Sequence, residues 1–280
     1  MIRILVDTSA DFSLEEIKEK GLELVPIHIT IGGKDYRDIV DLSKEEFYQL
    51  LLSNEEFPKT SQPSPQDFVE AFEDAKEKGD EIICLLLSSA LSGTCQSATL
   101  AKNIVEYDKI HIVDSLTATH MIRVLAEHAK KRVAEGAAAE AIVEELEELK
   151  SRVKVLAALD TLEYLYKGGR LSKASAVIGE VARIKPIISV SEEGKVVVVG
   201  KCMGKNKAIT TLMKMLSERE LDESFPVLSL YTYGQENSEV FDARLDEAGY
   251  TKEGRYQIGA SIGAHIGPGV FGVVFVEKKK

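Results

Sequence analysis

The sequence contains no tryptophan, and aromatic residues make up only 6% of its 280 positions. Proteins that bind single-stranded nucleic acids stack the bases on aromatic rings, so the composition disfavours this mode of binding. The formal net charge of −11 also opposes nucleic-acid binding, because that binding depends on neutralising phosphates with lysine and arginine. The composition therefore argues against a nucleic-acid-binding protein.

Long apolar runs and paired cysteines are missing too. No apolar stretch reaches the roughly 18 residues that a membrane-spanning helix requires, and Asp7 interrupts the first run too early for a signal peptide. The three cysteines, Cys84, Cys95 and Cys202, lie far apart and form no CxxC pair, which disfavours disulfides and cysteine-ligated zinc. We expect a protein of the reducing cytoplasm without a transmembrane segment, and transient membrane contact is compatible with this expectation.

Motifs for nucleotides and metals are absent as well. Lys205 follows a glycine but lacks the rest of the GxxxxGK[ST] phosphate loop. Gly259, Gly263 and Gly267 are spaced four apart, unlike the GxGxxG motif of dinucleotide-binding proteins. The five histidines form no HxH or HExxH pattern, so no metal site is predicted. Asp7 has no second carboxylate two residues further on to share a Mg²⁺ ion, and we expect it to cap a loop.

Short apolar segments alternate with helical patterns, which is typical of an α/β protein. Ile2–Val6 and Glu81–Leu87 are nearly continuous apolar runs, as expected of parallel strands with both faces covered. Pro186–Val190 and Lys195–Lys201 flank a short turn and predict an antiparallel hairpin. Capping sequences predict helices that begin after Ser13, Ser43 and Ser64.

The charge distribution divides the chain near residue 151. Residues 1–150 hold 16 basic and 30 acidic residues, whereas residues 151–280 hold 19 basic and 16 acidic residues. We predict two α/β domains: residues 1–151, mainly parallel with a small hairpin insertion near 22–42, and residues 152–280, with a mixed or antiparallel sheet. Lys167–Lys207 holds nine basic and three acidic residues, forming either a docking surface or a solvated face.

Three segments rich in hydroxyl groups or glycine are expected in loops at strand ends: Thr60–Ser64, Ser88–Thr94 and Gly263–Gly269. In open α/β sheets, ligands bind beyond the carboxyl ends of the strands, where helix N-termini offer free N–H groups. Together these loops favour a small anion as the ligand. The alternatives are an ordinary helix N-cap at Ser89 or Ser92 and a purely structural His265.

Three further observations leave alternatives open. Ser92 and His265 could form the nucleophile and base of a hydrolase, although the GxSxG elbow is missing. Cys95 lies near a predicted helix N-terminus, where a thiolate would be favoured, but we expect it to be a small buried apolar residue. Arg170 follows two glycines in a turn that would expose it, so it is either functional or a surface charge.

Five segments taken in order resemble the DegV family over essentially the whole chain: Asp7–Asp11, Thr60–Ser64, Ser88–Thr94, Lys167–Arg170 and His265–Gly269. Members of this family are bacterial fatty-acid-binding proteins that serve as the lipid-carrying subunit of fatty acid kinase. The resemblance implies two α/β domains with an acyl chain buried between them.

The resemblance also implies roles for individual residues. The fatty-acid carboxylate would be held by Thr60, Ser92 and His265, and Arg170 would act in phosphotransfer. The remaining ligand-binding positions that it implies are Ser61, Gly93 and Thr94. A separate kinase subunit would supply ATP and Mg²⁺ and form an acyl phosphate, so this chain would need no cofactor and no catalytic residue of its own. A stand-alone serine hydrolase and a lipid carrier without a kinase partner stay open as alternatives.

Overall fold

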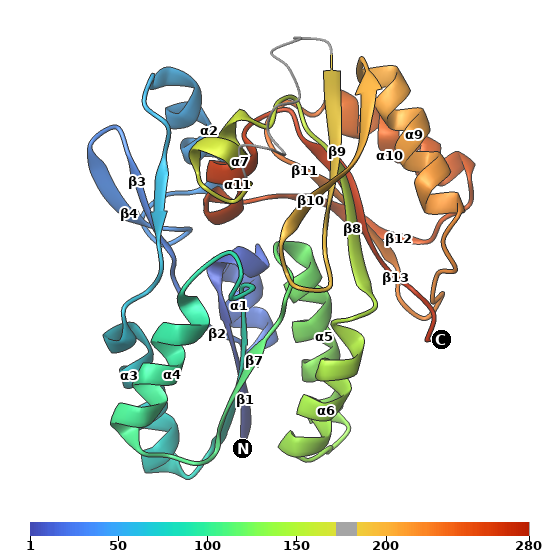
Figure 1. The fold of residues 1–280 in the computed structure, drawn as a ribbon. Helices are drawn as coiled ribbons and strands as arrows, with labels where there is room; N and C mark the ends of the chain where they lie inside the picture. Colours follow the sequence, from blue (N-terminus) through green and yellow to red (C-terminus); the bar gives the residue numbers. More distant parts are fainter. Residues whose placement is uncertain (172–183, 280) are drawn as a thin grey trace.

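The computed structural model of this protein describes residues 1–171 and 184–279. Two large sheets with their helices form the body of the molecule, and a small third sheet lies to one side (Figure 1). This arrangement confirms the predicted α/β class, with a parallel sheet in the N-terminal half and a mixed sheet in the C-terminal half. No helix in the described part of the chain is long and apolar enough to span a membrane.

The N-terminal sheet is entirely parallel, with the strand order β2-β1-β6-β7. Its strands are β1 (Ile2–Asp7), β2 (Glu23–Val25), β6 (Glu81–Leu86) and β7 (Ile110–Asp114). One face packs against α3 (Pro65–Lys78) and α4 (Thr94–Val105), and the other against α5 (His120–Ala134) and α6 (Ala139–Leu149). Residues of β6 alternate between the two apolar clusters, which confirms a strand covered on both faces.

The C-terminal sheet is mixed, with the strand order β10-β9-β8-β13-β11-β12. Only β11 and β12 pair in parallel, and the predicted hairpin is confirmed by the antiparallel pairing of β9 with β10. The strands are β8 (Val153–Ala158), β9 (Ile184–Val190), β10 (Val196–Met203), β11 (Val227–Tyr231), β12 (Lys252–Gln257) and β13 (Phe271–Val276). Helices α9 (Lys205–Ser217) and α10 (Glu236–Glu247) cover one of its faces.

The third sheet corresponds to the predicted hairpin insertion with one added strand. Its strands are β3 (His28–Ile31), β4 (Lys34–Arg37) and β5 (Lys59–Ser61), in the antiparallel order β4-β3-β5. The remaining helices among the described residues are α1 (Leu14–Lys20), α2 (Lys44–Ser53), α7 (Glu163–Lys167), α11 (Ala260–Ile266) and the short 3₁₀ helix η1 (Thr8–Ala10). Helix α11 belongs to the C-terminal half of the chain but contacts α2, β3 and β5.

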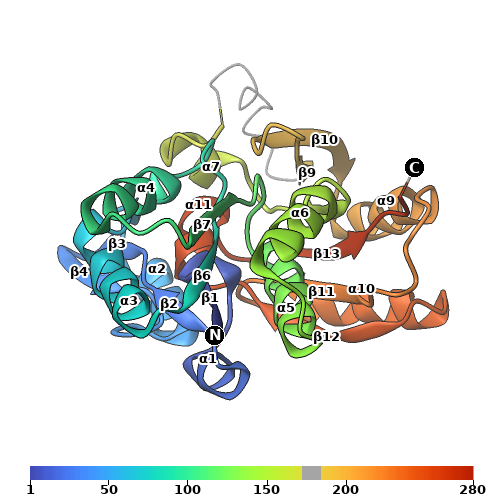
Figure 2. The ribbon, with the colours of Figure 1, turned by 90° about the horizontal axis from the view of Figure 1, so that it is seen from below.

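Helices α5 and α6 lie between the two large sheets (Figure 2). A single apolar cluster includes Ile83 of the parallel sheet, Val155 and Val274 of the mixed sheet, and Ile122 and Ile142 of the two helices. Sheet membership changes between the end of α6 and the start of β8, close to the predicted boundary at residue 151. Because the core continues across that boundary, the division into two domains stays a prediction.

Several local signals act as predicted. The capping boxes at Ser13 and Ser43 open α1 and α2, and α3 begins after Ser64, whose backbone N–H donates to Asp67. The side chain of Asp7 accepts the backbone N–H of Ser9 at 2.9 Å, which confirms its role as a cap. Cys95 is buried and free, as expected.

The prediction of a loop at Gly263–Gly269 is wrong for residues 263–266. Residues 260–266 form helix α11, so His265 lies in the last turn of a helix. A Cβ atom at Gly263 would lie 2.5 Å from Oη of Tyr48, so this glycine permits close packing of α11 on α2. Only Gly267 and Gly269, with φ of 74° and 76°, have the conformation of a glycine loop.

Gly272 is expected to be essential to the mixed sheet, because its Cβ would lie 2.4 Å from the backbone oxygen of Leu156 on β8. Replacing Gly272 with Ala should lower the free energy of unfolding by about 1–3 kcal/mol through overpacking. Gly200→Ala is the control, since a Cβ there would meet Ile187 at an ordinary 3.5 Å. Chemical denaturation measures both variants, and equal stabilities would contradict the assignment.

Candidate functional site

A cavity of about 390 Å³ lies where the carboxyl ends of the parallel strands meet β5, α7 and α11. This volume falls in the usual range for small-molecule sites. Most of its lining is apolar, contributed by Ile27, Leu87, Leu91, Ala118, Leu165, Val196, Ile262 and Ile266. Its polar lining residues are Thr60, Ser61, Gln62, Ser92, Arg170, Ser261 and His265. The fold therefore brings together residues from all three predicted loops and from the predicted glycine turn.

Thr60 and His265 meet across the two halves of the chain. Thr60 lies on β5, which pairs antiparallel with β3 so that Thr60 is half-buried between its exposed neighbours. The Oγ1 atom of Thr60 lies 2.8 Å from Nε2 of His265, within hydrogen-bond distance. A strand from the small sheet and a helix from the C-terminal half thus place two hydrogen-bonding groups at the same wall of the cavity.

Ser92 lies on the loop between β6 and α4, where it lines the cavity with Gly93. Its Oγ atom lies 2.8 Å from Oγ1 of Thr94, which is fully buried and lies outside the cavity lining. The N-cap of α4 is Gly93, so the alternative of an ordinary N-cap at Ser89 or Ser92 is wrong. Ser92, whose hydroxyl is paired with Thr94, instead lines the cavity near the N-terminus of a twelve-residue helix, where negative charge is stabilised.

Gln62 lines the cavity and lies within the predicted segment Thr60–Ser64, although it was not among the predicted ligand-binding residues. Its amide donates to Oγ of Ser97 at 3.1 Å, so the side chain crosses the start of α4. A Cβ atom at Gly93 would lie 1.8 Å from Oε1 of Gln62. The glycine of the SSxLSGT segment therefore makes room for a polar side chain at the wall of the cavity.

The imidazole of His265 is uncharged at neutral pH. Burial lowers its pKa to about 4, and the nearby positive charge of Arg170 contributes to the shift. Its Nδ1 atom is buried and has no hydrogen-bond partner among residues 1–171 and 184–279. A Cβ atom at Gly168 would lie 2.2 Å from Nδ1, so the first glycine of the turn accommodates the ring.

Arg170 does not project into solvent, contrary to the expectation for its glycine turn. The side chain is half-buried, with Nε donating to the Leu91 carbonyl at 2.9 Å and Nη1 donating to the Gly168 carbonyl at 2.6 Å. Arg170 lines the cavity, and a guanidinium group offers five N–H donors in one plane. The bonds to the two carbonyl groups fix the position of this group.

Helix α11 is held by polar groups of the N-terminal half. The Asp38 carboxylate accepts the backbone N–H of Ser261 at 3.0 Å and also its hydroxyl, and Thr8 Oγ1 lies 3.0 Å from the same hydroxyl. The Asp11 carboxylate accepts the N–H of Gly259 at 2.6 Å. Burial raises the pKa of Asp38 to about 6 and also raises that of Asp11. These contacts orient the helix that carries His265.

The hydrogen bonds give no support to a serine hydrolase. Nε2 of His265 is directed to Thr60, and the Ser92 hydroxyl is directed to Thr94. No hydrogen bond joins Ser92 to His265 in the described part of the chain, and the Nδ1 atom that an orienting carboxylate would bind has no partner there. The same groups are instead suited to surround an anionic oxygen at the end of an apolar cavity.

The similarities to known proteins cover the whole chain. A sequence model of the DegV family, described as uncharacterised proteins, matches residues 1–278. A DegV domain-containing protein of Caldanaerobacter subterraneus is 37% identical over 279 residues, covering 99% of each chain. A fatty-acid-binding DegV family protein from Thermus thermophilus has a solved structure with a TM-score of 0.89 and 29% identity, covering 99% of both chains. A stearic-acid-binding protein from Eubacterium ventriosum has a TM-score of 0.89 and 25% identity over the same share.

The low pKa of His265 predicts a pH-dependent stability. Between about pH 6.5 and 4 the unfolded chain binds a proton at this residue that the folded chain does not, so stability falls as the pH falls. In protein stripped of ligand, the free energy of unfolding of His265→Gln should therefore fall by about 1–3 kcal/mol less than that of the wild type between these two pH values. Denaturant titrations at pH 7 and 4.5 test this, with His28→Gln as a control outside the cavity. A pH dependence identical to that of the wild type would contradict it.

Proposed function

Because the chain belongs to the DegV family, we propose that it binds a long-chain fatty acid in the cavity, with the carboxylate at Thr60, Ser92 and His265. The observation that carries the proposal is the division of the cavity wall into a large apolar surface and a small set of convergent polar groups. The fatty-acid-binding relatives with the same fold support it. Each methylene group of the tail contributes about 0.8 kcal/mol on burial, so the apolar wall supplies most of the affinity.

The polar end of the cavity suits a carboxylate that is to be phosphorylated while it is bound. Thr60 and Ser92 offer neutral hydroxyl donors, and His265 is uncharged in the ligand-free protein. Neutral donors hold a carboxylate more weakly than an ion pair does, so its oxygen keeps more of its nucleophilicity. We propose that a separate kinase subunit supplies ATP and Mg²⁺. The carboxylate oxygen would attack the γ-phosphorus, the bond to ADP would break, and the acyl phosphate would stay bound to this chain.

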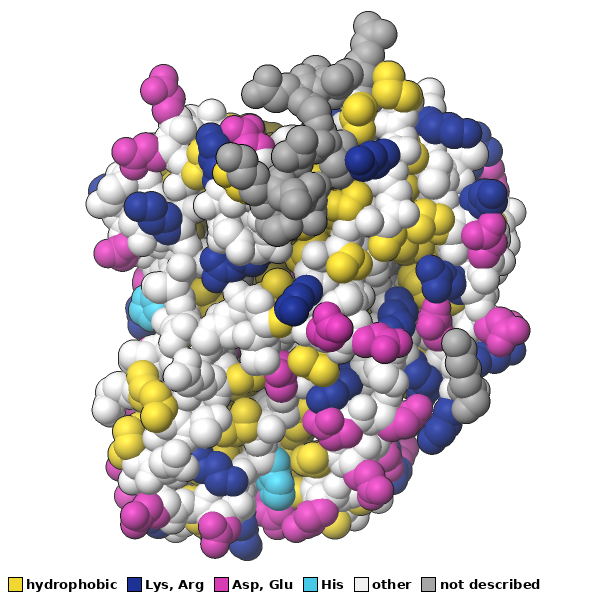
Figure 3. Space-filling model, in the orientation of Figure 1, with side chains coloured by type: hydrophobic (Ala, Val, Ile, Leu, Met, Phe, Trp, Pro, Cys, Tyr) yellow, Lys and Arg dark blue, Asp and Glu magenta, His cyan; other side chains and the backbone are white. Residues whose placement is uncertain are grey.

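Arg170 is suited to the phosphoryl group. Its planar guanidinium group matches the arrangement of phosphate oxygens, Arg170 lines the cavity, and the bonds to Leu91 and Gly168 hold the group in place. β10 and α9 also carry exposed lysines: Lys201, Lys205 and Lys207. Figure 3 shows lysine and arginine side chains interspersed with acidic ones over this face of the molecule. We propose that an acidic surface of the kinase docks here.

A reducing compartment is part of the same proposal, because ATP-dependent phosphorylation would take place in the cytoplasm. The three cysteines are buried and unpaired, as they would be in that compartment.

Ser92→Ala should weaken fatty-acid binding by about 1–3 kcal/mol, since the carboxylate would lose a donor. Ser89→Ala is the matched control, because Ser89 lies in the same loop but outside the cavity lining. Mass spectrometry of the denatured wild-type protein should identify a bound fatty acid, and titration calorimetry compares the affinities of the variants. A polar metabolite in the extract, or equal affinities for both variants, would overturn the proposed ligand or its binding mode.

Arg170→Ala should leave fatty-acid occupancy nearly unchanged and reduce acyl-phosphate formation with the kinase at least about tenfold, about 1.4 kcal/mol in the barrier. Arg170→Lys should restore activity only in part, because an ammonium group retains the charge but not the planar arrangement of donors. Lys167→Ala is a control in the same turn, where Lys167 pairs with Glu163. Both quantities are measured on the same preparations. Loss of lipid from Arg170→Ala would assign the residue to binding, and phosphorylation at the wild-type rate would show that Arg170 has no part in phosphotransfer.

A further inference from the structure

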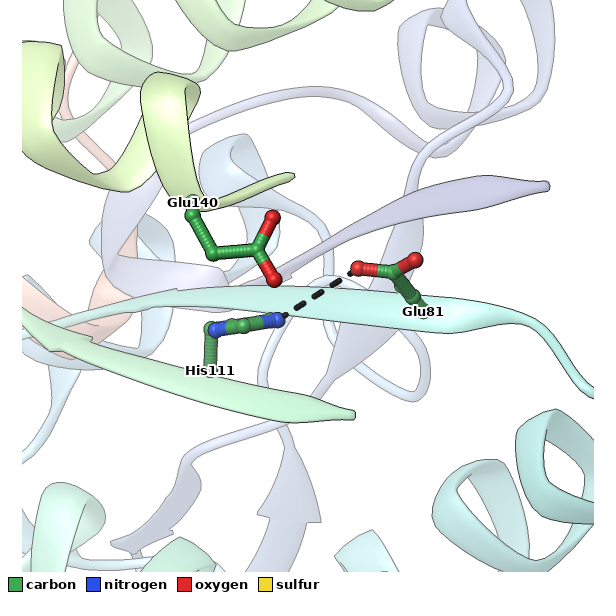
Figure 4. A group of neighbouring side chains, drawn as sticks. All are labelled: Glu81, His111 and Glu140. Atoms are coloured by element: carbon green, nitrogen blue, oxygen red, sulfur yellow. Dashed lines mark ion pairs between the residues drawn. The ribbon is translucent and has the colours of Figure 1, made fainter. Parts of the chain in front are cut away.

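A second group of polar side chains lies at the opposite end of the parallel sheet from the cavity. Glu81 is the first residue of β6, His111 lies on β7, and Glu140 lies in the first turn of α6. One carboxylate oxygen of each glutamate and one ring nitrogen of the histidine all lie within 4.8 Å of one another. Figure 4 shows the three side chains pointing toward a common centre.

The strand register explains why these residues meet. His111 is paired with Ile83, and Glu81 lies two residues before Ile83. The side chains of Glu81, Ile83 and His111 are therefore on the same face of the sheet. That face packs against α5 and α6, as the place of Ile83 in the shared core shows. The N-terminus of α6 therefore brings Glu140 over the two sheet residues. The three positions are far apart in sequence, which is why no histidine motif predicted them.

The ring of His111 is the unusual member of this group. Its Nε2 atom is buried and has no hydrogen-bond partner in the part of the chain that the structure describes. The nearest oxygen of Glu81 lies 3.7 Å away, too far for a hydrogen bond. A buried nitrogen without a partner destabilises the fold, and it faces two carboxylates that attract positive charge. A cation between the three groups would satisfy all of them.

We propose that Glu81, His111 and Glu140 bind a divalent transition-metal ion, with Zn²⁺ as the best fit. One imidazole and two carboxylates are common zinc ligands, whereas Ca²⁺ and Mg²⁺ prefer oxygen ligands alone. Tetrahedral bonds of about 2.0–2.2 Å separate the ligand atoms by roughly 3.4 Å. The donors are up to 4.8 Å apart, so they must move together by about 1 Å, which the exposed side chain of Glu140 allows. Water would complete the coordination.

The ion would join β6, β7 and α6 at one point. It lies away from the cavity, since the cavity begins at Leu87, beyond the other end of β6. Its role is therefore structural: it would fix the N-terminus of α6, a helix whose apolar side packs in the core shared by both sheets. The inference is independent of the proposed lipid ligand.

The test uses the full chain without a histidine tag, treated with a chelator and then titrated with Zn²⁺. We expect one saturable site by calorimetry and a rise in Tm of at least about 3 °C at 100 times Kd. Co²⁺ at the same site should give the visible absorption of a tetrahedral or five-coordinate complex. His111→Ala and Glu140→Gln should each raise Kd at least tenfold, and the Tm without metal should change little in Glu140→Gln.

His128→Ala is the matched control, because His128 already bonds Glu145 at 2.9 Å and lies outside the group. This variant should bind Zn²⁺ like the wild type. Zinc binding that persists unchanged in both His111→Ala and Glu140→Gln would overturn the proposal, as would the absence of saturable binding. Lipid occupancy, measured in parallel, should be the same with and without Zn²⁺.

Discussion

Two buried carboxylates hold helix α11, which carries His265, in place. Asp11 and Asp38 belong to the N-terminal half of the chain, yet each accepts a backbone N–H group at the start of helix α11, from Gly259 and Ser261. Removing water from a carboxylate is costly, and the cost is offset only when its hydrogen bonds and charge partners are complete. Lys44, whose ammonium group donates to the carbonyls of Asp11 and Gln257, completes the arrangement.

The geometry of the cavity depends on this constraint. Helix α11 carries His265 at its C-terminal end, and its N-terminal end is the part that the carboxylates hold. The hydroxyl of Tyr48 adds a bond to the carbonyl of Ile258, so polar contacts at residues 258, 259 and 261 fix the start of the helix. A helix anchored in this way brings its histidine to Thr60, 205 residues earlier in the sequence. The polar end of the cavity thus depends on carboxylates that lie outside its lining.

Sequence patterns predict local structure here more reliably than they predict packing. The apolar runs of β1 and β6 and the capping boxes before α1 and α2 are local signals, and each formed the expected element. The segment at 263–269 was predicted to be a loop because glycine usually interrupts helices, but Gly263 is required by its contact with Tyr48. Arg170 was expected in solvent because its anchor, the Leu91 carbonyl, comes from a distant loop. The hydroxyl- and glycine-rich segments pointed to residues that line the cavity, and the ligand-binding roles that the resemblance implies stay predictions. The contacts of Gln62, Asp11 and Asp38 are ones that no spacing reveals.

The apolar core shared by α5, α6 and both large sheets limits how a ligand can enter. Hinged proteins admit ligands by swinging two lobes apart, but here that motion would expose the shared core to water at about 25 cal/mol for each Å². The two large sheets therefore form one cooperative unit, and the proposed acyl chain would enter and leave through small local openings at the cavity. The rate of exchange would then depend on the side chains that line the cavity more than on the global stability of the protein.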